Sequence, residues 1–282
     1  MADVGTIRTI GPKRLMAIKP FLDDVTGRVE IPSYIDTDPV AFMHAYTGKE
    51  DREIAGFFAA LMAWGRRDIV MKKVEDLMQR LDHRPYELIR NYAPTDAARF
   101  EGFVHRTWNS TDIDVLCTAL NRAYIQYGSF EGFWRDVYQQ SQRDGLNIME
   151  LFHHRFFALH PEAPARTRRH IGDARKGSSC KRLWLYLRWC IRKGSIVDTG
   201  IMDFMPASEL LIPLDVHVAR YARMLGLLGR PSNDWKAVVE LTERLRKLDP
   251  TDPGRYDYAL FGLGVLHLDV PDAFIINRAF AP

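Results

Sequence analysis

An uncharged apolar run at residues 54–64 is the feature that most constrains what this chain can fold into. The run is apolar on every side of a helix, so other elements must cover it all round. It is far shorter than the ~20 apolar residues that a membrane span needs. Gly65 follows directly and is suited to end a helix. The run therefore predicts a central helix buried inside a globular protein.

Most of the remaining chain repeats apolar residues at spacings of three and four, which is typical of amphipathic helices. Asp38 and Pro39 predict a helix start, Ser110 predicts a cap, and Ser232 or Asn233 predicts another. The other expected helices lie at residues 69–81, 130–138, 146–159, 181–191, 215–225 and 256–266. No sustained alternation of apolar and polar residues indicates a strand. The sequence therefore predicts an all-α fold.

The length of 282 residues lies near the upper limit of a single hydrophobic core. Two prolines within residues 160–164 interrupt the helical pattern. We therefore expect residues 1–282 to form one domain of two helical lobes with a cleft between them, connected near residues 160–165.

The composition, with 46% hydrophobic and 27% charged residues, is that of a soluble globular protein. Residues 1–21 contain no apolar segment of the export-signal type. We expect a monomer in the bacterial cytoplasm, associated with the nucleoid. Cys117, Cys180 and Cys190 form no CxxC pair, so we expect no metal centre, no cofactor and three small buried side chains.

Arginine and lysine residues are concentrated between residues 166 and 193, where only Asp173 opposes them. The net charge of the whole chain is only +3, so the rest of it is net acidic. Such a local block is typical of a phosphate-binding surface, although a solvated face explains it equally well. The basic residues are Arg166, Arg168, Arg169, Arg175, Lys176, Lys181, Arg182, Arg188, Arg192 and Lys193.

The stretch KGSSCK at residues 176–181 places a glycine and small residues directly before a lysine and an expected helix. Small residues let backbone N–H groups approach a phosphate oxygen at a helix start. The positive end of the helix dipole disfavours the protonated form of Lys181, and a neutral amine suits Schiff-base chemistry. An ordinary surface lysine at a helix start is the alternative interpretation.

The stretch IPLDVHVAR at residues 212–220 leads an apolar pair into Asp215, which opens an amphipathic helix. A plain helix cap is the alternative role for this aspartate. His217 lies two residues on, and we expect it to pack or cap at the helix start rather than to act as a base.

Together, these two stretches resemble the helix–hairpin–helix DNA glycosylase superfamily. LDVHVAR is similar to the segment that carries the catalytic aspartate there, and GSSCK occupies the place of the hairpin that ends in the lyase lysine. The long separation of the two resembles the archaeal 8-oxoguanine DNA glycosylase/AP lyase branch. The closest likeness is to a bacterial family of uncharacterised relatives of that branch, through SSCKRLWLYLRW, LIPLDVHVAR and DPGRYDYALFGLG, over roughly residues 38–268.

The resemblance implies a helix–hairpin–helix-like element and catalytic roles for Lys181 and Asp215. It also implies that Asp257 and Phe261, in YDYALF, contact the damaged base. Trp64 falls where many members have a glutamine that faces the flipped base or the gap it leaves.

The sequence also departs from this pattern. Leu185 and Arg188 stand where the archaeal enzymes have an aromatic residue and a second lysine, and Ser179 replaces the second glycine of the hairpin. Trp184 lies about 100° away from Leu185 around the helix, and we expect it to pack in the core.

The resemblance further implies base excision repair of DNA: base flipping, Schiff-base formation by Lys181 and β-elimination, with an oxidised purine, most naturally 8-oxoguanine, as substrate. We expect Arg66 or Arg67 to fill the gap left in the stack. The other expected DNA contacts are Gly177, Ser178, Ser179, Arg175, Lys176 and Arg182. Three alternatives remain open: a non-catalytic nucleic-acid-binding module of the same fold, an enzyme on another base, nucleoside or RNA, and a helical scaffold for protein partners.

Overall fold

A computed structural model describes residues 7–281 of the chain. Helices make up 63% and strands 2% of the structure, which confirms the all-α prediction at that level. The expectation that residues 1–21 lack an export signal concerns in part residues 1–6, which lie outside the described residues. Within the described part, no helix combines the length and the apolar character needed to cross a membrane.

The α-helices run in chain order as α1 (Pro12–Val29), α2 (Pro32–Ile35), α3 (Ala41–His44), α4 (Lys49–Met62), α5 (Arg67–Arg80), α6 (Pro85–Arg90), α7 (Ser110–Tyr127), α8 (Phe130–Asp144), α9 (Ile148–Ala158), α10 (Ala165–Arg168), α11 (Lys181–Ile191), α12 (Val216–Met224), α13 (Trp235–Arg246) and α14 (Tyr256–Val265). A short antiparallel hairpin joins β1 (Val104–His105) to β2 (Trp108–Asn109). Short 3₁₀ helices lie at Pro94–Phe100, Ala174–Lys176, Ala207–Glu209, Pro253–Arg255, Asp272–Phe274 and Arg278–Phe280.

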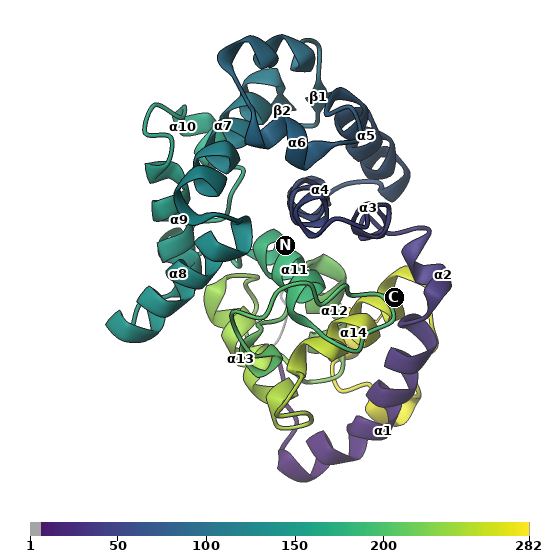
Figure 1. Cartoon of the computed structure of the whole chain (residues 1–282). Helices are drawn as coiled ribbons and strands as arrows, with labels where there is room; N and C mark the ends of the chain where they lie inside the picture. Colours follow the sequence, from purple (N-terminus) through teal and green to yellow (C-terminus); the bar gives the residue numbers. More distant parts are fainter. Residues whose placement is uncertain (1–6, 282) are drawn as a thin grey trace.

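The helices fall into two groups, which Figure 1 shows one above the other. One group holds α4 to α10 with the hairpin, and the other holds α1 and α11 to α14. The chain passes from the first group to the second between α10 and α11, just beyond the connection that the sequence predicts at residues 160–165. Buried hydrophobic residues of both groups belong to one continuous cluster.

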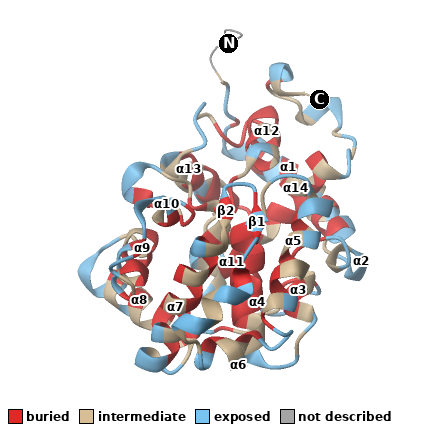
Figure 2. Ribbon diagram, turned by 90° about the horizontal axis from the view of Figure 1, so that it is seen from above, coloured by how far each residue is buried: buried red, intermediate tan, exposed pale blue. Residues whose placement is uncertain are grey.

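Helix α4 carries the apolar run and lies at the centre of the molecule, beside α11 (Figure 2). Every residue from 53 to 62 is buried, which confirms the prediction of a central buried helix. The helix starts earlier than the run, at Lys49, and ends at Met62. Trp64 therefore lies in the loop that follows. Gly65 adopts a φ of +103° in that loop, a conformation that favours glycine.

Helix α1 is the main element that the sequence analysis does not include. Its buried residues repeat at spacings of three and four, and this signal could have found it. The helix packs against α14. The contact is close because Gly262 on α14 has no side chain: a Cβ built there would lie 2.4 Å from Val29.

Several predicted starts shift by one or two residues. Asn109 rather than Ser110 caps α7, and it forms a capping box with Asp112. Asp234 caps α13 in place of Ser232 or Asn233. The start predicted at Asp38 leads only into the four-residue helix α3. The boundaries predicted for α11 agree with the structure.

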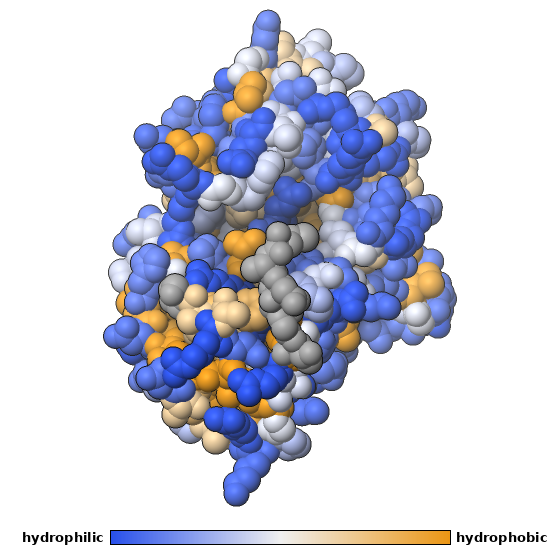
Figure 3. Space-filling view, turned by 180° about the vertical axis from the view of Figure 1, so that it is seen from behind, coloured by the Kyte–Doolittle hydropathy of each residue, from blue (hydrophilic) through white to orange (hydrophobic). Residues whose placement is uncertain are grey.

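The three cysteines are buried, as predicted. Trp184 is also buried, and its ring centroid lies 6.3 Å from that of Trp235, so it packs in the core as expected. Figure 3 shows one face of the surface, where hydrophilic residues cover most of the area and hydrophobic residues gather in the lower half.

Candidate active site

One cavity of about 310 Å³ brings together side chains from distant parts of the fold. Lys181 comes from the start of α11, Asp215 from the start of α12, and Asp257 and Phe261 from α14. The loop after α4 adds Trp64. More than thirty residues separate Lys181 from Asp215, so only the packing of the helices brings them to one cavity.

The first residue of α11 is Lys181, which follows a 3₁₀ helix at Ala174–Lys176 and a turn at Gly177. Cys180 before it adopts a left-handed conformation with a φ of +51°. The preceding segment packs on Gly172, where a Cβ would lie 2.8 Å from the Ser178 hydroxyl. Trp235 N donates to the Gly177 carbonyl at 3.1 Å, which ties this segment to α13. The lysine side chain therefore projects from a braced backbone.

Burial lowers the pKa of Lys181, and the neighbouring Arg182 lowers it further, whereas Asp215 and Asp257 oppose the shift. The sequence predicted a lowered pKa for Lys181, but on the grounds of the helix dipole rather than burial. Within residues 7–281, the ammonium group takes part in no hydrogen bond or ion pair. A larger fraction of the amine is neutral at a given pH than in a solvated lysine, as a nucleophile requires.

Asp215 caps α12, and its Oδ1 accepts a hydrogen bond from Val218 N at 2.8 Å. The carboxylate also lines the cavity, so the capping role and a role in the site are compatible. His217 packs at the start of the same helix. Its ring meets Phe261 edge-on with centroids 6.1 Å apart, which fits the packing role expected of it.

Asp257 lies on α14 with only 4% of its surface exposed. Burial raises its pKa to about 7, although Arg188 beside it opposes the shift. Its Oδ2 is paired with Arg188 Nη1. Its Oδ1 has no hydrogen-bond partner among the described residues. The cavity therefore contains a buried oxygen whose hydrogen-bonding capacity is unused, which is rare in folded proteins.

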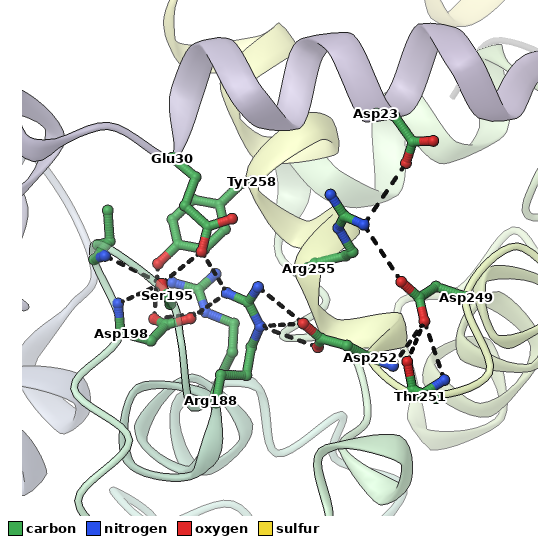
Figure 4. A network of polar contacts seen from close by, with 12 residues as sticks. Asp23, Glu30, Arg188, Ser195, Asp198, Asp249, Thr251, Asp252, Arg255 and Tyr258 are labelled. Carbon is green, nitrogen blue, oxygen red and sulfur yellow. Dashed lines mark hydrogen bonds and ion pairs between the residues drawn. The ribbon is translucent and has the colours of Figure 1, made fainter.

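A buried network of charges holds Arg188 in place (Figure 4). Arg188 Nε lies 3.4 Å from Asp198 Oδ1, which also accepts a hydrogen bond from the Tyr258 hydroxyl at 2.7 Å. Arg192 pairs with the same Asp198, and also with Asp252 at 3.0 Å and Glu30 at 2.9 Å. Two cations of the basic block thus belong to the interior rather than to a phosphate-binding surface.

The two arginines after the central helix lie in different environments. Arg66 is exposed and pairs with Asp68 at 2.8 Å. Arg67 instead lines the cavity, where its guanidinium lies 3.6 Å from Asp38. Trp64 lines the cavity too. The guanidinium carbon of Arg106, between β1 and β2, lies 4.5 Å from the centroid of the Trp64 ring.

Arg182 also lines the cavity, but its guanidinium is engaged by the protein itself. It donates to the carbonyl oxygens of Leu61 at 2.6 Å and His170 at 2.7 Å. These bonds tie the start of α11 to the end of α4 and to the segment after α10. Burial lowers the pKa of Arg182 to about 10.

Two basic depressions lie near the cavity. The first, of about 560 Å³, shares Trp64, Lys181 and Arg182 with the cavity and adds Arg166 and Arg169. The second, of about 700 Å³, shares Arg169 with the first, and its lining also includes Arg168, Arg175, Lys176 and Ser178. The first depression therefore borders the cavity, and the second borders the first. Gly177 and Ser179 belong to the KGSSCK segment before α11, and they line neither the cavity nor the two depressions.

Tyr34 and the side chain of Asp38 are polar parts of the cavity lining that the sequence did not predict. Asp38 is buried and Tyr34 is half-buried, and the Arg67 guanidinium lies 5.8 Å from the centroid of the Tyr34 ring. Asp38 was expected only as a helix cap. No local pattern marks either residue, because their proximity to α14 arises from the packing of the N-terminal segment.

Residues 38–266 match a family described as protein of unknown function (DUF2400). This match covers most of the 282-residue chain. The chain belongs to the DUF2400 family. All the cavity residues named above except Tyr34 lie within the DUF2400 match. No curated protein and no solved structure matches the chain.

Proposed function

We propose that this protein is a DNA-repair glycosylase with AP-lyase activity, which removes an oxidised purine, most naturally 8-oxoguanine. One observation carries the proposal. A lysine with a lowered pKa, which forms no ion pair with any described residue, shares a cavity with a carboxylate, Asp215, that opens the neighbouring helix. The resemblance of the two surrounding stretches to helix–hairpin–helix glycosylases supports the same pair of residues.

The chemistry requires the damaged nucleotide to leave the duplex and enter the cavity. The neutral amine of Lys181 attacks C1′ of the sugar, and the bond from C1′ to the base breaks. The base leaves with the bonding electrons and takes up a proton. Asp215 accepts the proton released by the amine and stabilises positive charge on the sugar.

The bond between C1′ and the ring oxygen then breaks, the ring oxygen takes up a proton, and an iminium forms between the lysine nitrogen and C1′. Loss of a proton from C2′ then expels the 3′ phosphate, which breaks the C3′–O bond and nicks the strand. Water hydrolyses the remaining iminium and frees Lys181 for another cycle. Every group in this sequence comes from the chain, the DNA or water.

The cavity has the volume and lining expected for a base. Its 310 Å³ lies at the lower end of the roughly 300–1,000 Å³ typical of small-molecule sites. Phe261 offers an aromatic face, and Asp257 Oδ1 offers an unused acceptor to an N–H group of the base. Arg188 takes part through Asp257, because their ion pair fixes the position of the carboxylate.

The two basic depressions support binding of the phosphate backbone. The first borders the cavity at Lys181, and together the two contain the exposed cations Arg169, Arg175 and Lys176. Contacts between such cations and the phosphates position a duplex without reading its sequence. The KGSSCK segment lies beside them, but the backbone N–H groups of Lys176, Gly177, Ser178 and Cys180 already donate to acceptors within the protein.

Borohydride trapping tests the proposal directly. The protein is incubated with duplexes that contain 8-oxoguanine, uracil, hypoxanthine or an abasic site, and reduction fixes any imine as a covalent protein–DNA band. We expect adducts with the 8-oxoguanine and abasic duplexes. Lys181→Gln should give none, whereas the matched Lys247→Gln variant, at an exposed lysine after α13, should react as the wild type does.

Different outcomes separate the alternatives. Equal trapping by Lys181→Gln overturns the assignment of the lysine. Tight DNA binding without any adduct or cleavage indicates a non-catalytic module of the same fold. Release of another base, with 8-oxoguanine untouched, removes the substrate assignment but leaves the glycosylase assignment in place.

A further inference from the structure

Arg67 has an unusual environment for a residue at the start of a surface helix. It opens α5, yet its side chain is only 29% exposed, whereas the side chain of Arg66 is 80% exposed. Its guanidinium lies 5.6 Å from the centroid of the Phe261 ring and 5.8 Å from that of Tyr34. The Arg67 guanidinium therefore lies close to two aromatic rings that line the cavity.

The guanidinium of Arg67 also has unused hydrogen-bonding capacity. Its Nη2 is buried and has no hydrogen-bond partner among the described residues. The nearest carboxylate oxygen, on Asp38, lies 3.6 Å away, which is too far for a hydrogen bond. A buried donor without a partner is costly to a folded protein, so a ligand that supplies an acceptor would bind favourably.

The opposite kind of unused group lines the same cavity. Asp257 Oδ1 is a buried acceptor with no hydrogen-bond partner among the described residues, and Phe261 on α14 also lines the cavity. Among the described residues, the cavity lining therefore includes the unpaired donors Arg67 Nη2 and Trp64 Nε1, the unpaired acceptor Asp257 Oδ1 and an aromatic face. A flat ring system with a carbonyl oxygen and an N–H group has the complementary pattern.

We infer that Arg67 is a specificity-determining residue that donates a hydrogen bond to a carbonyl oxygen of the extruded base, while Asp257 accepts one from an N–H group of the same base. The inference rests on the proposed glycosylase function and deepens it. It assigns the substrate to bases with a carbonyl oxygen. A base without this oxygen leaves the Arg67 donor unpaired in the cavity.

The test compares two reactions of the same enzyme. Excision of the base that the wild type releases fastest depends on base contacts, whereas cleavage at an abasic site does not. Arg67→Met should slow single-turnover excision by about ten- to a hundredfold, the effect of losing one charged hydrogen bond. It should change cleavage at the abasic site less than about twofold, since no base is present there.

Two further variants sharpen the result. Arg67→Lys keeps the charge but loses the planar fork, so it should recover only part of the excision rate. Arg84→Met makes the same substitution at an exposed arginine just after α5 and should react as the wild type does. Normal abasic-site cleavage by Arg67→Met would also show that the variant is folded.

The outcomes distinguish the inference from the proposed function. Excision by Arg67→Met at the wild-type rate overturns the inference alone. An equal loss of excision and abasic-site cleavage also overturns it, because it indicates a structural role for the arginine. A wild-type protein that reacts with no duplex overturns the proposed function, and the inference falls with it.

Discussion

Replacement of the buried Arg188 by methionine tests how the charge network shapes the cavity. Only 2% of the side chain of Arg188 is exposed, and it pairs with Asp257 and Asp198. Removal of one partner of a buried ion pair typically costs about 3–5 kcal/mol of the free energy of unfolding. Asp198 retains Arg192 and the Tyr258 hydroxyl, so the uncompensated charge falls on Asp257.

The size of this loss should depend on pH, because Asp257 can take up a proton. Its pKa in the folded wild type is about 7, above the value of 3.8 for an unperturbed aspartate. A raised pKa means that the folded state binds the proton more tightly, so the contribution of Asp257 to stability falls as pH rises from 3.8 to 7. Without Arg188 the pKa rises further, and the fall continues above pH 7.

The expected magnitude follows from linkage. Between pH 7 and the new pKa, the difference in unfolding free energy between wild type and Arg188→Met grows by about 1.4 kcal/mol per pH unit. Urea unfolding should therefore show a destabilisation that is roughly 2–3 kcal/mol larger at pH 9 than at pH 6. In an Asp257→Asn background, which lacks the titrating group, the Arg188→Met effect should lose this pH dependence. A destabilisation of the same size at both pH values would refute the reasoning.

Two further predictions concern the core. Glu53 on α4 is fully buried, and burial raises its pKa to about 7, so its contribution to stability falls as pH rises from 4.5 to 7. Glu53→Gln should remove this dependence, so its free energy of unfolding in urea should gain about 2–3 kcal/mol relative to the wild type between pH 5 and pH 8. The prediction is contradicted if the free energies of both proteins change with pH in the same way. Gly262→Ala should force α14 away from Val29 and cost about 1–3 kcal/mol, measured in the same way. An unchanged midpoint of urea unfolding would contradict this prediction, because it would show that α1 can move away at no cost in stability.

Local patterns in the sequence were sufficient to predict most helices. The apolar run predicted the buried α4, and the spacing of Leu and Trp residues predicted the bounds of α11. The position of Asp215 before an amphipathic stretch predicted the cap of α12. These signals are local because a helix satisfies its own backbone hydrogen bonds and shows its buried face in a repeat of 3.6 residues.

Only part of the candidate site could be predicted, and that part depended on the resemblance to helix–hairpin–helix glycosylases. Lys181, Asp215, Asp257 and Phe261 line one cavity, together with Trp64 and Arg188. The charge pattern alone was misleading, because it grouped Arg188 and Arg192 with the surface cations. A sequence gives the sign and position of a charge along the chain, but not the partner that it meets.

Only the tertiary structure decided which charges are buried, paired or left without a partner. Arg66 and Arg67 are neighbours in sequence, yet the first faces solvent and the second lies between rings from α2 and α14. Asp257 owes its raised pKa to burial among helices far apart in the chain. The physical reason is that desolvation and ion pairing depend on distances across packed helices, which no local repeat encodes.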